Sequence, residues 1–237
     1  MARTGFFHHI GTFLLFAATI LLLVTTISSP VVNDLAILKV DLGNRVNSYH
    51  STVTFGTFGW CANNLNGDGV DNCSKKTLGY SPAAVMNQVD NTQFSDYATR
   101  TTRSLTKAMV LHPIATGLNF IAFALALGAG VVGSLLASLV AALAFLVTLV
   151  ILIIDFVLFS IVKSNVNDDG TGAHAFYASA AWTLLVSAIC SLLGTIVVFL
   201  TCCSGRLHRR RDGMTTKHEV VQDGYAAPAT RRRRRWF

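Results

Sequence analysis

The stretch that decides the fold is residues 108–154, which read AMVLHPIATGLNFIAFALALGAGVVGSLLASLVAALAFLVTLVILII and contain no Asp, Glu, Lys or Arg. A helix rises 1.5 Å per residue, so about 20 apolar residues cross the roughly 30 Å hydrocarbon core of a bilayer. These 47 residues (154 − 108 + 1) are too many for one span, and Gly128, Gly130 and Gly133 suit a tight turn near their middle. We therefore predict two membrane spans, residues 108–128 and 134–162.

Two further tracts without Asp, Glu, Lys or Arg, 5–33 and 170–205, predict one span each, at 10–29 and 176–203. The whole chain is 52% hydrophobic and 13% charged, whereas an average soluble domain is about one-quarter charged. This composition argues against a soluble enzyme and predicts an all-α transmembrane four-helix bundle. The first span is longer than the roughly 7–15 apolar residues of a signal peptide, so we expect it to be retained, with a cleaved signal as the alternative.

The basic residues set the expected orientation. Residues 204–237 carry ten Lys and Arg against three acids, and the positive-inside rule places such a tail in the cytoplasm. With four spans, the N-terminus is then cytoplasmic too. We expect a multi-pass plasma-membrane protein with a cytoplasmic N-terminus (1–9), a large outer loop (30–107), a short cytoplasmic turn (129–133), a small outer loop (163–175) and a basic cytoplasmic tail (204–237).

The large outer loop contains two of the five cysteines, Cys61 and Cys73. Disulfides persist on the oxidising outer side of a cell, so we predict that these two are bonded, with two free thiols as the alternative. Partial alternation of β-branched and aromatic residues predicts short strands within 31–42 and 51–58. The polar and apolar pattern of 83–107 predicts an amphipathic helix that leads into the second span.

A local pattern surrounds these cysteines. Its aromatic and glycine positions are Gly56, Phe58, Gly59 and Trp60 before Cys61, and Gly79 and Tyr80 after Cys73. In a long first outer loop of a four-span chain, this pattern resembles the fungal PalI-type family, which joins ambient-pH response regulators with eisosome-associated plasma-membrane proteins. The glycine-aromatic-cysteine strand is also similar to the first extracellular segment of claudins. The resemblance implies a claudin-like shape, with a small disulfide-linked extracellular β-sheet on the bundle.

Three titratable residues are expected near the outer ends of the spans: His112, Asp155 and His174. An acid inside a span is a functional candidate by default, but Asp155 lies about 30 Å along its helix, at the outer interface, where solvation lowers its cost. Because histidine changes charge near neutral pH, we hypothesise a pH-responsive rim formed by these three residues. The alternative is that they are ordinary solvated interface residues.

Small residues recur every four positions on the third span, at Gly130, Ser134, Ser138 and Ala142. This spacing lets helices approach closely within a membrane. It predicts packing within the bundle, with a homodimer face as the alternative.

The tail offers two membrane-anchoring signals. Cys202 and Cys203 end the fourth span beside Arg206, a setting that favours S-palmitoylation, although unmodified cysteines are the alternative. The terminal basic cluster favours binding to anionic lipids at about 1 kcal/mol per residue, and it consists of Arg231, Arg232, Arg233, Arg234 and Arg235. Because four spans hold the chain in a membrane, we expect no nucleic-acid partner for this cluster.

The sequence contains no nucleophile elbow, no phosphate-binding glycine loop and no metal-type spacing of Cys and His. We therefore expect no catalytic residues, no metal and no cofactor. The expected function is that of a non-enzymatic membrane protein, which organises membrane domains or acts as an accessory subunit to another integral membrane protein. Its expected partners are the lipid bilayer, anionic lipids, and another membrane protein or a second copy of itself. An accessory of an ambient-pH sensing receptor is the alternative within this class, and a small pore is the outsider.

Overall fold

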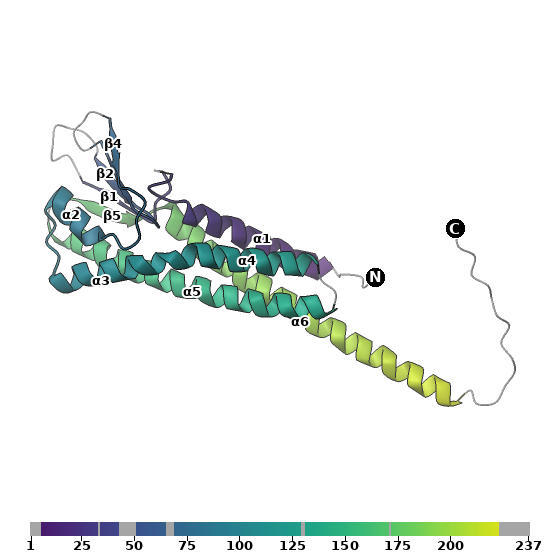
Figure 1. Cartoon of the computed structure of the whole chain (residues 1–237). Helices are drawn as coiled ribbons and strands as arrows, with labels where there is room; N and C mark the ends of the chain where they lie inside the picture. The colour runs from purple at the N-terminus through teal and green to yellow at the C-terminus, as the bar shows by residue number, and fades with distance from the viewer. Residues whose placement is uncertain are drawn as a thin grey trace.

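In the computed structural model, four long helices run side by side (Figure 1): α1 (Phe6–Thr26), α4 (Leu111–Leu127), α5 (Val131–Asp168) and α6 (Ser179–Gln222). The structure describes residues 6–32, 34–42, 51–64, 69–128, 131–170 and 172–222, and it describes side chains from His8 to Thr201 except those of 131, 132 and 134. Helix α1 packs against α4 and α6, and both of these pack against α5. Within the described residues, four helices are long and apolar enough to cross a membrane, as predicted.

The helices differ from the predicted spans at their ends. Helix α3 (Asp96–Lys107) and the 3-10 turn η1 (Ala108–Val110) lead directly into α4, and α5 extends six residues beyond the predicted end at 162. Residues 174–177 form strand β5, so α6 begins at Ser179 rather than at 176, and it continues past 203 to Gln222. The extension of α5 is helical because Val162 and Val166 are buried in the apolar core beneath the sheet.

A five-stranded antiparallel sheet sits at one end of the bundle, which we call the sheet end (Figure 1). Its strands lie in the order β4-β3-β2-β1-β5. Strands β1 and β2 fall inside the stretches predicted to be extended. The five strands are β1 (Leu38–Asp41), β2 (Thr52–Phe55), β3 (Trp60–Asn63), β4 (Asp71–Cys73) and β5 (His174–Tyr177).

The segment predicted as one amphipathic helix over 83–107 is two helices, α2 (Pro82–Asp90) and α3. Asn91 ends α2 in the left-handed conformation, with a φ of 56°. Ser95 then begins α3, and its side chain accepts a hydrogen bond from the amide of Ala98 at 3.2 Å. Asn and Ser favour these terminal positions because their short polar side chains tolerate or satisfy unpaired backbone groups.

The interior has two parts. Under the sheet, Val53 and Phe55 pack with Leu158 and Phe159 of α5. Inside the bundle, small residues such as Ala122 and Ala141 let the helices lie close together. The bundle's outer surface is apolar, with Leu, Ile and Phe side chains 36–67% exposed along all four helices, which is the surface that lipid requires. The beginning of α1 and the end of α4 lie at the end of the bundle away from the sheet (Figure 1).

Candidate functional site

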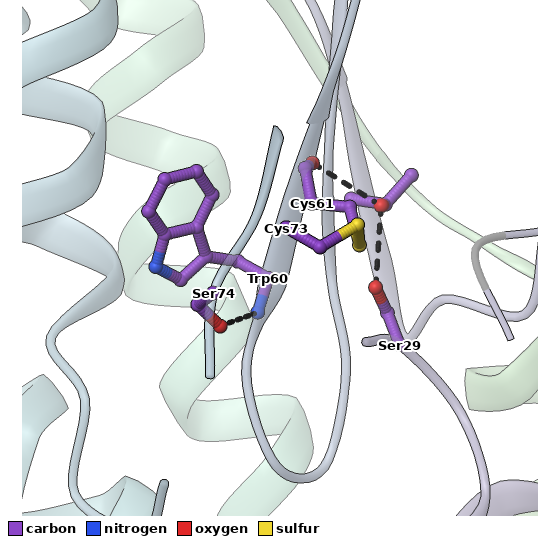
Figure 2. Close-up of a disulfide and its surroundings, with 6 residues drawn as sticks. Ser29, Trp60, Cys61, Cys73 and Ser74 are labelled. Carbon is purple, nitrogen blue, oxygen red and sulfur yellow. Dashed lines mark hydrogen bonds between the residues drawn. A yellow bond between two sulfur atoms is a disulfide. The ribbon is translucent and has the colours of Figure 1, made fainter. Parts of the chain in front are cut away.

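The predicted disulfide joins Cys61 of β3 to Cys73 of β4, and these residues face each other in the strand register (Figure 2). Beside it, the hydroxyl of Ser74 accepts a hydrogen bond from the amide of Trp60 at 3.1 Å. The hydroxyl of Thr54 on β2 donates to the carbonyl of Cys61 at 3.3 Å. The disulfide therefore holds the edge strand β4 on β3, and hydrogen bonds hold β3 on β2.

The turn between β2 and β3 consists of residues 56–59, the first part of the sequence pattern. It is closed by a hydrogen bond from the amide of Gly56 to the carbonyl of Gly59, at 2.9 Å. A Cβ atom at Gly56 would overlap the backbone carbonyl and amide of Ser29, and one at Gly59 would overlap the hydroxyl of Ser74. Gly56 requires glycine because the turn lies directly against the chain that follows α1, and Gly59 is crowded by the residue that follows β4.

Thr57 fastens this turn to the end of α1. Its amide donates to the hydroxyl of Ser28 at 3.0 Å, and its own hydroxyl donates to the carbonyl of Thr25 at 3.0 Å. Thr25, Ser28 and Thr57 are each no more than 1% exposed. Since the last carbonyls of a helix lack partners within the helix, Thr57 satisfies one of these carbonyls while it holds the sheet on the bundle.

Tyr80 attaches the same turn from the other side. Its hydroxyl donates to the carbonyl of Gly56 at 2.7 Å, and its own carbonyl accepts a hydrogen bond from the hydroxyl of Thr106 at 2.6 Å. Burial of the hydroxyl raises the pKa of Tyr80, and the Asp155 carboxylate raises it further. The phenol therefore stays protonated and keeps donating. We call the group formed by the turn 56–59, Thr25, Ser28 and Tyr80 the junction.

Below the junction, Nε2 of His112 on α4 lies 3.1 Å from Oδ2 of Asp155 on α5. His112 is fully buried and Asp155 is 2% exposed, so the expectation that they are solvated interface residues is wrong. Nδ1 of His112 lies 3.2 Å from the carbonyl of Met109. The second carboxylate oxygen of Asp155 is buried and has no hydrogen-bond partner among the residues that the structure describes. The pair is enclosed because the sheet and the extended α5 cover this end of the bundle.

His174, the third residue of the hypothesised rim, lies elsewhere. It is exposed on the edge strand β5, where its register partner is Asp41 of β1. In the described part of the chain, no hydrogen bond joins His174 to the buried pair. The structure therefore brings together two of the three rim residues.

The model of the SUR7/PalI family matches residues 7–204, which include all five strands and most of the four long helices. This chain belongs to the SUR7/PalI family. The resemblance inferred from the cysteine pattern and the four spans is confirmed, and the fold of this family member, a four-helix bundle with a disulfide-linked sheet, is consistent with a claudin-like architecture.

Two curated relatives are named as pH-response regulators. The chain is 31% identical over 116 residues to the pH-response regulator protein palI/RIM9 of Pyricularia oryzae, an alignment that covers 49% of this chain and 14% of the relative. It is 29% identical over 114 residues to the pH-response regulator protein palI/prr-5 of Neurospora crassa, covering 48% of this chain and 14% of the relative. The chain thus spans about one-seventh of the length of either relative.

The bundle of this SUR7/PalI member contains a polar contact that the sequence analysis missed. Asn119 of α4 accepts a hydrogen bond from the hydroxyl of Ser191 on α6 at 3.0 Å, and its amide nitrogen lies 3.5 Å from the hydroxyl of Thr148 on α5. All three residues are fully buried. The signal in the sequence was an asparagine in the middle of a span, where a polar side chain needs a partner on a neighbouring helix.

The small residues predicted to pack are only partly on the buried face of α5. Ser138 is buried and donates to the carbonyl of Leu135 at 2.8 Å, whereas Ala142 is partly exposed. Gly130 and the side chain of Ser134 lie outside the described residues. The buried stripe continues through Ala137, Ala141, Ala144 and Thr148.

Among the glycines that the structure describes, those in α1 and α6 allow a close approach of these two helices. A Cβ atom at Gly194 would lie 3.1 Å from the side chain of Leu15 and 3.3 Å from the carbonyl of Gly11. A Cβ atom at Gly11 would lie 3.0 Å from Val198. The two glycines therefore let α1 and α6 pack backbone against backbone.

The two predicted membrane anchors of the tail fall outside the part that the structure describes in detail. Cys202 and Cys203 lie within α6, but their side chains are not described, and the arginine cluster 231–235 lies beyond the described residues. Acylation and anionic-lipid binding stay predictions.

Proposed function

We propose that this protein is a non-enzymatic plasma-membrane protein that serves as an accessory subunit of another integral membrane protein or organises a membrane domain. The observation that carries the proposal is the junction, which fixes the sheet rigidly on a bundle with an apolar outer surface. A fixed sheet presents a constant surface to a partner, and this lowers the entropic cost of binding. In the proposed orientation the sheet faces outward and both termini are cytoplasmic.

The sheet end offers polar and aromatic groups for such recognition. Tyr97 of α3 is 80% exposed, and Arg100, Arg103 and Lys107 are exposed on the same helix at spacings of three and four residues. Residues so spaced share one face of a helix. An exposed tyrosine beside arginines is typical of the residues that contribute most to protein interfaces.

The test is purification of the tagged protein from its native membrane into nanodiscs, followed by sizing and mass spectrometry. A stoichiometric integral membrane partner supports the accessory role, and large lipid-rich assemblies of the chain alone support the organising role.

A double variant, Tyr97→Ala and Arg100→Ala, should weaken capture of a partner if the α3 face is the contact. The matched control is Trp182→Ala, on the lipid-facing surface of α6. Recovery of a monomer without any partner would overturn both roles.

A second candidate is an accessory role in the ambient-pH response, favoured by the names of the two pH-response relatives. Deletion of the gene should then impair growth in alkaline medium while leaving growth in acidic medium unchanged, and the intact chain should restore it. Unimpaired alkaline growth of the deletion strain would remove this candidate. The organising role predicts instead a patchy surface distribution that depends on lipid composition.

A further inference from the structure

The hydrogen bonds around His112 fix how many protons the His112–Asp155 pair holds. Nδ1 faces the carbonyl of Met109, which can only accept, so this nitrogen carries a proton. Nε2 faces Oδ2 of Asp155 at 3.1 Å, and a hydrogen bond there requires one further proton between the nitrogen and the oxygen. Whether that proton sits on the imidazole or on the carboxyl group, the pair as a whole is electrically neutral.

We propose that His112 and Asp155 form a buried proton-binding site that closes α4 against α5 at the sheet end and opens when its shared proton is lost. Loss of this proton to solvent leaves a net charge of −1 in an enclosed site. An imidazole with a single proton then has two acceptors to satisfy and can satisfy only one. The other contact becomes a repulsion between lone pairs, and the unpartnered second oxygen of Asp155 adds to the need for water.

The other titratable groups around the pair do not supply this response near neutral pH. Burial and, after it, the charge of the Asp155 carboxylate raise the pKa of Tyr80, so this phenol stays neutral well above pH 10. The hydroxyl of Tyr177 on β5 lies 3.4 Å from the carbonyl of Phe156, with the ammonium of Lys163 5.1 Å from its ring centroid. The side chain of Lys107 lies against the backbone of Gly79.

The site is positioned to move the sheet. His112 lies in the first turn of α4, directly after η1, and contacts the carbonyl of Met109. Tyr80, whose hydroxyl donates to the carbonyl of Gly56 in the junction, packs against the core cluster that includes Met109 and Leu158. Water that enters between α4 and α5 therefore weakens the attachment of the turn 56–59. The inference goes beyond the proposed function because it concerns a response of the isolated chain, whether or not a partner is bound.

The test uses the full chain in nanodiscs, with histidine labelled by nitrogen-15. The His112 signals are identified by their absence in His112→Gln. At pH 6 we expect both nitrogens of His112 to be protonated or to share a proton with Asp155. As the pH rises to 9, the proton should be lost, and the amides of 56–60 and of 109–116, apart from Pro113, should lose exchange protection about twofold to tenfold, the equivalent of one buried hydrogen bond, after correction for the intrinsic rate.

Asp155→Asn tests the mechanism without removing the contact. The amide group can donate to a neutral Nε2 or accept from a protonated one, so this variant should stay closed and show no loss of protection across the same range. His174→Gln, at the exposed histidine, should behave like the unmodified chain. The proposal is overturned if Nε2 of His112 neither carries a proton nor accepts one from Asp155 at pH 6, if the pair loses this proton without a change in protection, or if Asp155→Asn keeps the full pH response.

Discussion

Replacement of Gly56 by alanine tests the junction. The added Cβ would overlap the backbone carbonyl and amide of Ser29, and backbone atoms cannot rotate away as the end of a side chain can. Overpacking of this kind costs about 1–3 kcal/mol. The turn must move, and the hydrogen bond from Tyr80 to the Gly56 carbonyl is then lost, which adds about 1 kcal/mol. We expect a loss of about 2–4 kcal/mol in the free energy of unfolding.

The assay is unfolding of the detergent-solubilised chain in increasing denaturant, followed by tryptophan fluorescence, because Trp60 packs in the core under the sheet. Gly117→Ala is the matched control. Apart from its own turn of helix, no described heavy atom lies within 4 Å of the position a Cβ would take at Gly117, and that residue is exposed on α4, so alanine there should be neutral or slightly stabilising through helix propensity. Equal stability of the two variants would refute the reasoning.

Three further predictions concern the same framework. Replacing Cys61 and Cys73 by serine should cost about 3 kcal/mol, the chain-entropy value for a loop of this length, and an unchanged unfolding midpoint under reducing and oxidising conditions would contradict it. Tyr80→Phe should cost about 1 kcal/mol near neutral pH by removing the hydrogen bond to the turn. Because the pKa of this phenol is raised in the folded chain, its contribution is present below pH 10 and is lost above it, so the variant should show a smaller alkaline loss of stability than the unmodified chain. Asn119→Leu should lower bundle stability by about 0.6–1.7 kcal/mol, the range of single interhelical hydrogen bonds in membranes, and a variant as stable as the parent in the same denaturant titration would exclude a stabilising role.

The sequence predicted the features that depend on local composition. Charge-free tracts located the four helices, and the outer position of the loop identified the disulfide between Cys61 and Cys73. The sequence could not predict β5, because residues 174–177 adjoin the apolar run of α6. They become a strand only by pairing with β1, more than 130 positions earlier. That pairing, and not local preference, delays the start of α6 to Ser179.

Only part of the candidate site was predicted, because His174 lies apart from the other two residues of the hypothesised rim. The sequence singled out His112 and Asp155 by residue type and depth, yet it placed them in water. Their environment depends on long-range packing: the sheet packs on α5 at Leu158 and Phe159, and Tyr80, about 75 positions before Asp155, packs against the same core. Periodicity likewise identified small residues on the third span but not the buried stripe through Ala137 and Ala141, since that depends on which neighbouring helices pack there.

The most direct test of the account is the side of the membrane on which the sheet end lies. Tyr97→Cys, at a position 80% exposed on α3, is introduced into a chain in which Cys190, Cys202 and Cys203 are replaced by serine, and intact cells are treated with a membrane-impermeant maleimide. The account predicts labelling of residue 97 without permeabilisation, and no labelling of a cysteine placed at Phe237 until the membrane is opened. Labelling of residue 97 only after permeabilisation would contradict the proposed orientation and, with it, recognition of a partner by an outward-facing sheet.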